Sequence, residues 1–244
     1  YRIVRELMSS IFHFKQFSIN QANCAMKVNT DGVLLAALAN FRSPLKILDV
    51  GTGTGLIALM LAQKYTSAIV HAVEIDQNAA DTAKENFLNS PFSDRIALFH
   101  SSIKDQFAIS TEQYDLIISN PPFFINSLSS QNPEKSVARH TDLSFFEVLL
   151  TESADRLNQS GHICIILPLE TAELVKKMIS DSGLLNVQKE ILIYSFPESK
   201  PHRTIMVMGF ETLPPVEQYL VIYESKGVYS AVYRNLLKDY LTIF

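Results

Sequence analysis

A glycine-rich turn directly after an apolar strand constrains the fold of this 244-residue chain most strongly. The run Lys46–Val50, "KILDV", has the pattern of a buried strand, and three of the chain's eight glycines follow it: Gly51, Gly53 and Gly55. Glycine allows a positive φ and lets a ligand approach the backbone closely. In an open α/β sheet, ligands bind beyond the carboxyl ends of the strands. The pattern therefore predicts an α/β sheet with a ligand site at this turn.

Strand-like and helix-like segments alternate along the middle of the chain. Further strands are expected at 68–76, 95–100, 114–119 and 161–168, and helices at 56–65, 77–89, 144–157 and 169–183. This alternation indicates a parallel sheet with helices on both faces. The runs 189–196 and 203–210, joined by a short polar loop, predict an antiparallel pair. We therefore expect an α/β fold with a doubly wound, mostly parallel, seven-stranded sheet and an antiparallel C-terminal hairpin.

The chain shows no internal repeat or low-complexity linker, so we expect one domain over residues 1–244. An N-terminal extension, 1–43, contains a helix at 31–40 with Thr30 or Asp31 as its N-cap. The core covers 44–212 and includes a long polar loop, 125–142. A C-terminal extension, 213–244, adds a strand at 219–223 and a helix. Its expected role is to cover an edge of the sheet.

Composition limits the possible partners. A formal net charge of −4 argues against coating nucleic acid through bulk charge, although a local basic rim is compatible with it. The two cysteines, Cys24 and Cys164, are far apart and form no CxxC pair, so neither a disulfide framework nor a metal site is expected. No apolar run reaches the roughly 18 to 20 residues of a membrane span, and no signal peptide is recognisable. We expect a cytoplasmic monomer without metal or membrane contact.

A second acidic residue, Glu74, closes the second strand. A carboxylate at this position can accept hydrogen bonds from both ribose hydroxyls of a nucleotide. The runs "LDVGTGTGL" and "AVEID" together resemble the cofactor signature of class I S-adenosylmethionine-dependent methyltransferases. The resemblance implies S-adenosylmethionine as the cofactor, with its methionine part at the glycine turn and its ribose at Glu74. The cofactor-binding residues then expected are Lys27, Thr30, Asp49, Gly51, Thr52, Gly53, Gly55, Glu74, Ile75, Ser102, Ile103 and Asn120.

One position departs from the family pattern. The third strand of these enzymes usually ends in an aspartate that binds the amino group of the cofactor's adenine. Here the corresponding run is "HSSIKD", with Ser102 at the expected place and Asp105 three residues later. The adenine contact can then come from Ser102, from backbone groups or from a shifted Asp105.

The stretch "SNPPFF" follows the strand at 114–119. An exocyclic amino group is a poor nucleophile, because its lone pair is conjugated with the aromatic ring. Acceptors aimed at its N–H bonds free that lone pair, and the side-chain oxygen of Asn120 and the carbonyl of Pro121 can supply them. Pro122 rigidifies the backbone and Phe123 offers a ring for stacking on the base. The run resembles the D/N-P-P-Y/F/W motif of amino-methylating enzymes, so Asn120, Pro121, Pro122 and Phe123 are the expected catalytic residues.

Two flanking stretches bear on the substrate. The segment "FKQFSINQANCAMKVNTDG" and the turn "KPHRTIMV" resemble the bacterial adenine-N6 methyltransferases that act on valine tRNA next to the anticodon. Three alternatives remain: a glutamine-amide methyltransferase acting on release factors, an adenine-N6 methyltransferase acting on rRNA, and a non-enzymatic RNA-binding module. Release-factor enzymes usually carry a separate helical domain, for which the roughly 40 residues before the first strand are too few.

A tRNA substrate requires a surface that contacts RNA. We expect Phe124, Arg139, His140, His202 and Arg203 to bind it. The four basic residues of this set, Arg139, His140, His202 and Arg203, would form a basic rim at the carboxyl ends of the strands together with Lys15, Lys27, Lys135 and Lys200. The loop 125–142 is expected to close on a flipped base.

Overall fold

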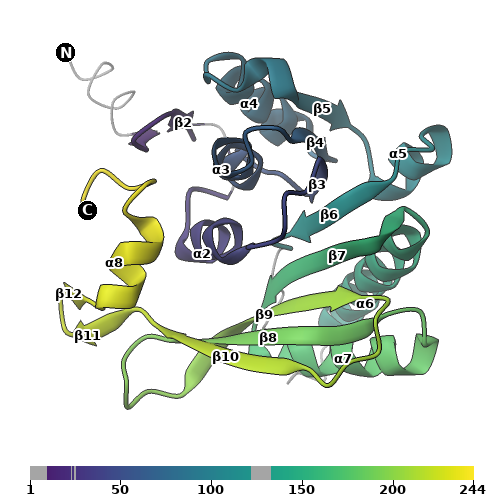
Figure 1. Cartoon of the computed structure of the whole chain (residues 1–244). Helices are drawn as coiled ribbons and strands as arrows, with labels where there is room; N and C mark the ends of the chain where they lie inside the picture. Colours follow the sequence, from purple (N-terminus) through teal and green to yellow (C-terminus); the bar gives the residue numbers. More distant parts are fainter. Residues whose placement is uncertain (1–9, 23, 25, 122–132) are drawn as a thin grey trace.

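The computed structural model describes residues 10–22, 24, 26–121 and 133–244, with the backbone alone for 133–143. Its centre is an eight-stranded sheet with the order β10-β8-β9-β7-β6-β3-β4-β5 (Figure 1). The strands are β3 (Lys46–Val50), β4 (Ile69–Glu74), β5 (Ile96–His100), β6 (Tyr114–Ser119), β7 (Leu157–Leu167), β8 (Asn186–Tyr194), β9 (Pro201–Gly209) and β10 (Val216–Val221).

The strand directions confirm the predicted fold class. Strand β3 pairs in parallel with β4 and β6, β4 with β5, and β6 with β7. Strand β9 runs antiparallel to both β7 and β8, as the predicted hairpin requires. The sheet has eight strands rather than the seven expected, because β10 from the C-terminal extension pairs in parallel with β8. This pairing satisfies the backbone groups that β8 would otherwise expose at the edge.

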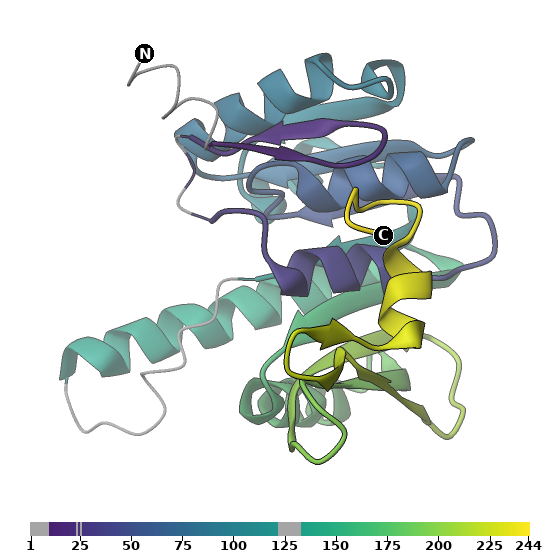
Figure 2. The ribbon, with the colours of Figure 1, turned by 90° about the vertical axis from the view of Figure 1, so that its left-hand side faces the viewer.

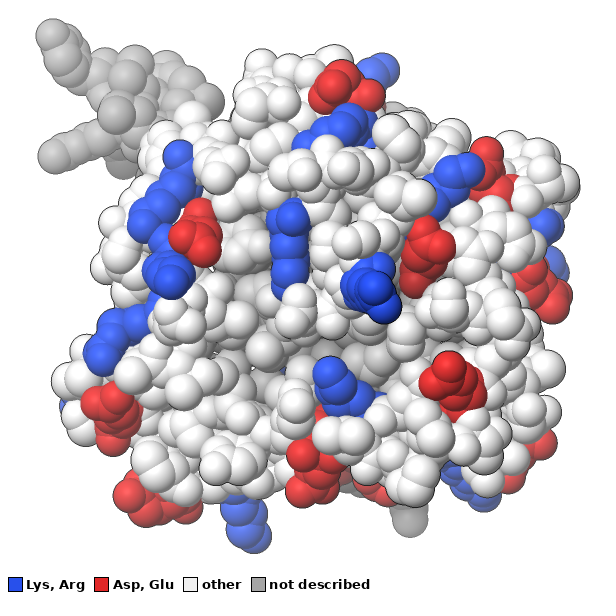
Figure 3. Space-filling model, in the orientation of Figure 1, with Lys and Arg blue, Asp and Glu red and all other residues white. Residues whose placement is uncertain are grey.

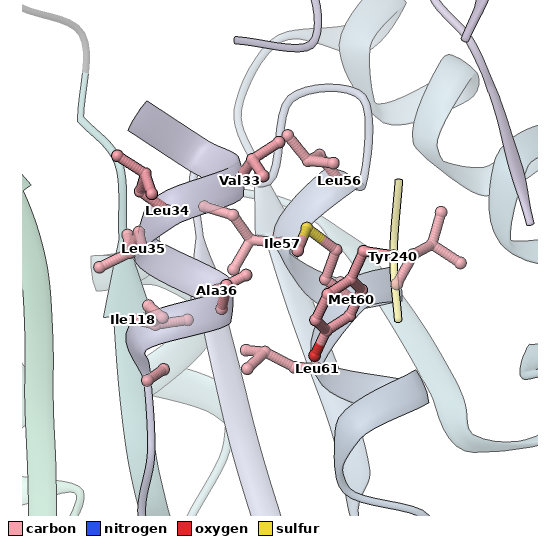
Figure 4. Close-up of a cluster of buried hydrophobic side chains, with 14 of the residues drawn as sticks. Val33, Leu34, Leu35, Ala36, Leu56, Ile57, Met60, Leu61, Ile118 and Tyr240 are labelled. Carbon is pink, nitrogen blue, oxygen red and sulfur yellow. The ribbon is translucent and has the colours of Figure 1, made fainter. Parts of the chain in front are cut away.

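Helices cover both faces of the sheet because successive strand residues point in opposite directions. Ile47 belongs to one hydrophobic cluster and the next residue, Leu48, to another. The first cluster lies under α2 (Thr30–Leu38), α3 (Leu56–Lys64) and α4 (Gln77–Leu88); the second under α5 (Ile103–Ile109), α6 (Pro133–Asp155) and α7 (Leu169–Ser182). Figure 4 shows α2 packed against α3, with Ile118 of β6 and Tyr240 of the C-terminal segment alongside.

Three local expectations need correction. Helix α6 begins at Pro133, so residues 133–142 are helical where a loop was expected, and residues 122–132 lie outside the described part of the chain. The N-cap of α2 is Asn29, whose side chain accepts a hydrogen bond from Gly32 N, rather than Thr30 or Asp31. Helix α5 was not expected; Ser102 caps it, since serine readily accepts from the first free amides of a helix.

The two ends of the described chain meet. The hairpin of β1 (Ile11–His13) and β2 (Ser18–Asn20) packs beside the C-terminal segment, and Phe14 forms a bridge with Leu241. Figure 2 shows hairpin and segment on the same side of the molecule. The Lys15 ammonium donates to Lys238 O and to Phe244 O, the latter at 2.8 Å. Lys15 therefore holds the C-terminal segment.

None of the helices in the described part of the chain combines the length and the apolar character of a membrane span.

Candidate active site

The glycine turn after β3 adopts the conformation that the sequence predicts. Gly51, Gly53 and Gly55 have φ angles of 71°, 58° and 83°, in the left-handed region that favours glycine. A Cβ at Gly51 or Gly53 would meet no described atom within 4 Å, so the space above this part of the turn is open. A Cβ at Gly55 would lie 2.4 Å from a ring carbon of Phe87. The turn is thus open to a ligand on one side and closely packed on the other.

A buried carboxyl group supports the turn from below. Asp49 has no exposed surface, and its Oδ2 accepts from the Thr52 hydroxyl at 2.6 Å and from Ala58 N at 3.2 Å. Burial raises the pKa of Asp49 from 3.8 to about 7, although these two hydrogen bonds oppose the shift. Asp49 therefore holds the turn in place and does not line the hollow above it.

The raised pKa of Asp49 predicts a pH-dependent stability. Between pH 4 and 7 the folded chain keeps a proton that the unfolded chain has lost, so this group's contribution to the free energy of unfolding falls as pH rises. Asp49→Asn removes the titration and keeps an acceptor oxygen. The difference in unfolding free energy between the natural chain and the variant should fall by about 4 kcal/mol from pH 4 to 8. Urea denaturation at several pH values measures it; parallel curves would contradict the raised pKa.

Glu74, at the end of β4, is fixed by three backbone amides. Its Oε2 accepts from Gly53 N at 2.9 Å, and its Oε1 accepts from Ile75 N and Asp76 N at 2.9 and 3.0 Å. Only 8% of Glu74 is exposed. A carboxylate has about four acceptor sites, so it retains capacity for a hydroxyl of a bound ribose. The same contacts join the end of β4 to the glycine turn.

The expected adenine contacts lie at the end of the neighbouring strand, β5. The Ser102 hydroxyl donates to Asp105 Oδ2 at 2.7 Å and accepts from Asp105 N at 3.1 Å, so the two alternative candidates are direct neighbours. Ile75 is 71% exposed, whereas Ile103 is buried. Ser101 N donates to Glu74 O at 3.0 Å, which holds this strand end beside Glu74.

Asn120 follows β6 at the same edge of the sheet. It is 8% exposed, and its Oδ1 has no hydrogen-bond partner among the described residues. The preceding residue is anchored, because the Ser119 hydroxyl donates to Val50 O at 2.8 Å. A buried, unpaired amide oxygen is costly unless a ligand satisfies it. Asn120 therefore carries a buried acceptor oxygen that the described part of the chain leaves unpaired.

The N-terminus of α2 lies against Asn120. A Cβ at Gly32 would lie at ordinary contact distance from Asn120 Nδ2 and Asn29 Oδ1, 3.6 and 3.5 Å, and at a tight 3.0 Å from Leu56 Cδ2. The next residue toward the N-terminus, Asp31, accepts from Arg203 Nε at 2.8 Å. The ion pair ties α2 to the start of β9 and brings Arg203 near the site.

One hollow joins several of the residues that the sequence singles out. Lys27, Gly51, Thr52, Gly53 and Asn120 line it together. Thr30 begins α2 beside it, Gly55 ends the turn, and Ile75, Ser102 and Ile103 lie farther along the edge. Sequence reasoning missed the other lining residues: Met26, Asn29, Gly32, Thr54, Leu56 and Ile57. Among them Asn29 had a signal in the sequence, because it begins the run "NTDG" and asparagine is a good N-cap residue.

A second hollow lies beside the first along the same edge. His202 and Arg203 line it with Pro201 and with residues 168–171, which follow β7. His202 Nδ1 is buried and has no partner within the described ranges, and burial lowers the pKa of this ring. The other predicted catalytic and substrate-binding residues are outside the described part of the chain: Pro122, Phe123 and Phe124 entirely, and Arg139 and His140 in their side chains.

A wider hollow occupies the opposite edge of the sheet. It is lined by residues 41–45, Asp115, 159–162, Gln188, Phe210 and Glu211. The described strands β3, β6, β7 and β8 begin there, whereas ligands of open α/β sheets bind where the parallel strands end. The smaller hollow at the glycine turn is therefore the candidate active site.

Comparisons with known proteins identify the family of this chain. The model of the methyltransferase small domain matches residues 24–195. A tRNA1(Val) (adenine(37)-N6)-methyltransferase of Pedobacter heparinus is 47% identical over 238 residues, covering 97% of this chain and 100% of that protein. An enzyme of the same name from Bacteroides thetaiotaomicron is 38% identical and covers 96% of this chain and 98% of its own.

The fold also matches a solved structure. A predicted O-methyltransferase from Agrobacterium tumefaciens aligns with a TM-score of 0.65 at 17% identity, covering 86% of this chain and 96% of that one. The match supports the class I methyltransferase fold alone. The full-length relatives confirm the predicted enzyme class and cofactor, and the chain belongs to the family of S-adenosylmethionine-dependent tRNA1(Val) (adenine(37)-N6)-methyltransferases.

Proposed function

We propose that this enzyme transfers a methyl group from S-adenosylmethionine to the exocyclic amino group of adenine 37, next to the anticodon of valine tRNA. The observation that carries the proposal is the buried, unpaired Oδ1 of Asn120 at the wall of the hollow beside the glycine turn. Full-length relatives with this activity support the substrate. A tRNA substrate also implies that the enzyme works in the cytoplasm.

The residues of the hollow suit the cofactor. Open space above Gly51 and Gly53 leaves room for its methionine part, with Lys27 in the lining of the hollow and Thr30 at the start of α2. Glu74 accepts from the ribose, and Ile75 and Ile103 lie at the strand ends where the adenine is expected. The Asp105 carboxylate, held by Ser102, accepts from the adenine amino group. The cofactor supplies a methyl group on a positively charged sulfur, a reaction that needs no metal.

The protein's contribution to the reaction is to orient and polarise the amino group. Asn120 Oδ1 and the backbone oxygen of Pro121 accept from its two N–H bonds and draw the lone pair out of conjugation with the ring. Fixed acceptors cost little reorganisation at the moment of transfer. Methyl transfer from the bound cofactor would form the nitrogen–methyl bond as the sulfur–methyl bond breaks, and the amino nitrogen would then lose one proton to solvent; the two amide oxygens accept hydrogen bonds and do not take the proton. We assign stacking on the base to Phe123, supported by Pro122.

Incubation with labelled S-adenosylmethionine and total tRNA, followed by nucleoside analysis, tests this function. We expect label in N6-methyladenosine from valine tRNA. Parallel incubations with release factors and with rRNA test the alternative substrates. Label in glutamine or in rRNA, with none in tRNA, would show that a release factor or rRNA is the substrate and that tRNA is not. Cofactor binding without turnover on any pool would favour a binding module.

Glu74→Gln should weaken cofactor binding by about 10- to 100-fold, because a charged acceptor is lost and an amide N–H₂ group faces backbone donors. Isothermal titration calorimetry with S-adenosylmethionine measures the change, and thermal unfolding shows whether the turn survives. Glu85→Gln, on the exposed face of α4, is the matched control and should bind normally. Unchanged affinity in Glu74→Gln would remove Glu74 from the ribose site.

A further inference from the structure

We propose that Phe196 is a stacking platform for a tRNA nucleotide that neighbours the target adenine. The inference rests on the proposed function, since it names a further contact of the same RNA. Phe196 lies in the loop between β8 and β9 and is 36% exposed. It is separate from the residues to which the methyl-transfer chemistry is assigned.

A row of aromatic rings supports Phe196 from behind. Its ring centroid lies 5.6 Å from that of Tyr223, which stacks on Tyr229 at 4.9 Å with an interplanar angle of 24°. Tyr229 stacks in turn on Tyr233 at 5.0 Å with an angle of 8°. Tyr233 is 6% exposed, so the row runs from the core to the surface and ends in Phe196. Such packing fixes the outermost ring, and a fixed ring loses little entropy when it stacks on a base.

The row stands at the edge of the sheet that carries the active site. Strand β7 is parallel to β6, and β9 is antiparallel to both β7 and β8, so β8 runs in the same direction as β6. Strand β10 is parallel to β8, so the ends of these two strands, at Tyr194 and Val221, lie at the same edge as Asn120. The chain after β10 continues this pairing, because Ile222 N donates to Tyr194 O at 2.9 Å and Tyr223 N to Ser195 O at 3.0 Å. The C-terminal extension thus packs beside the 195–200 loop.

The distance between Phe196 and Asn120 indicates which nucleotide of the tRNA can stack on Phe196. In the sheet order, β8 is three strand spacings from β6, which corresponds to about 14 Å. A base held at Asn120 cannot also reach Phe196. The hollow formed by residues 168–171 and 201–203 lies on the strands between them and offers a path for the intervening backbone. Phe196 therefore meets a neighbouring nucleotide and not the target.

The proposed tRNA substrate makes an RNA strand the occupant of this platform. Charges around Phe196 are mixed: exposed Lys200 shares its loop with exposed Glu198, and in the C-terminal extension exposed Lys226, Arg234 and Lys238 alternate with exposed Glu217, Glu224 and Asp239. Figure 3 shows several Lys and Arg side chains on the left of the molecule, over β2 and α8 (Ala231–Leu237), with acidic groups beside and below them. Aromatic rings beside basic side chains are the usual means of binding single-stranded nucleic acid.

The chain contains no tryptophan, so Phe196→Trp gives a single fluorescent reporter. Adding valine tRNA should quench it through stacking. The control is Ile109→Trp, since Ile109 is 82% exposed at the end of α5, at the opposite edge of the sheet, and should not respond. Phe196→Leu, which keeps an apolar side chain but has no ring, should raise KM for tRNA about tenfold at unchanged kcat. The salt dependence of KM should stay the same, because no phosphate contact is lost.

The outcomes separate this inference from the proposed function. If the natural chain does not methylate tRNA, the proposed function fails, and the platform fails with it. If the natural chain is active, a normal KM in Phe196→Leu together with an unquenched Phe196→Trp overturns the platform alone. Quenching of the Ile109→Trp control to the same extent also overturns it, because the signal would then not be specific to this edge. Should Phe196→Leu not fold, the two tryptophan variants decide.

Discussion

Replacing Asn120 by alanine is expected to lower kcat by about 10²- to 10³-fold and to leave cofactor affinity within a few-fold of the natural value. The magnitude is that of removing one fixed hydrogen-bonding group from a transition state. We expect an effect on kcat and not on cofactor affinity because of where Asn120 lies. Its Oδ1 is buried and unpaired in the described structure, whereas the glycine turn and Glu74 hold each other without Asn120. Single-turnover kinetics with saturating tRNA and cofactor, and calorimetric titration of the cofactor, measure the two effects.

Two variants make the Asn120 result interpretable. Asn120→Asp keeps acceptor oxygens in the same place and should retain far more activity than the alanine variant. Asn158→Ala removes an amide at the opposite edge of the sheet, where Asn158 Nδ2 donates to Asp115 Oδ1, and should leave kcat unchanged. Equal losses in Asn120→Ala and Asn158→Ala would indicate a general effect on stability. Full turnover in Asn120→Ala would exclude Asn120 as the acceptor.

Gly55→Ala should have the largest effect on stability. The residue must keep a φ of 83°, which costs a non-glycine residue about 1–2 kcal/mol. Its Cβ would also lie 2.4 Å from the Phe87 ring, and overpacking of this kind costs about 1–3 kcal/mol more. We therefore expect a loss of roughly 2–5 kcal/mol, with weaker cofactor binding because the turn moves. Urea denaturation and cofactor titration measure these changes.

The matched control for Gly55 is Gly227→Ala, in the turn between β11 (Tyr223–Ser225) and β12 (Val228–Tyr229). Gly227 has a φ of 80°, but a Cβ there would meet no described atom within 4 Å. The variant should show the conformational cost alone, about 1–2 kcal/mol. If both variants lose the same stability, the contact with Phe87 contributes nothing and the proposed reason for the larger effect is wrong.

Much of the fold could be predicted because its signals are local. The apolar run Lys46–Val50 matches β3 residue for residue, and the helix expected over 169–183 matches α7, which ends at a left-handed glycine, Gly183, with a φ of 63°. Strand and helix periodicities, caps and glycines act over a few residues, so they can be recognised without knowing the tertiary contacts. The carboxyl-end rule then assigned the glycine turn and Asn120 to one edge.

Errors arose where a local signal was weak or ambiguous. The start of α6 was assigned to a loop because the run 133–142 is polar and its helical pattern is poor, with a proline at its first position. That position suits proline, since the first helical residue needs no N–H partner. The predicted cap of α2 was one or two residues too far along the chain, because Asn29, Thr30 and Asp31 are all good N-cap residues.

The sequence by itself determined the sheet, the glycine turn and the residue types that hold a cofactor and an amino group, because each depends on neighbours in the chain. Tertiary structure alone decided what is distant in sequence: that Lys15 holds Lys238 and Phe244, that Asp31 pairs with Arg203, and that the strand of the C-terminal extension pairs in parallel with β8. It also lined up Phe196 with three tyrosines of the C-terminal extension. Such contacts produce no periodic pattern in the sequence, because they depend on how the ends of the chain fold back onto the sheet.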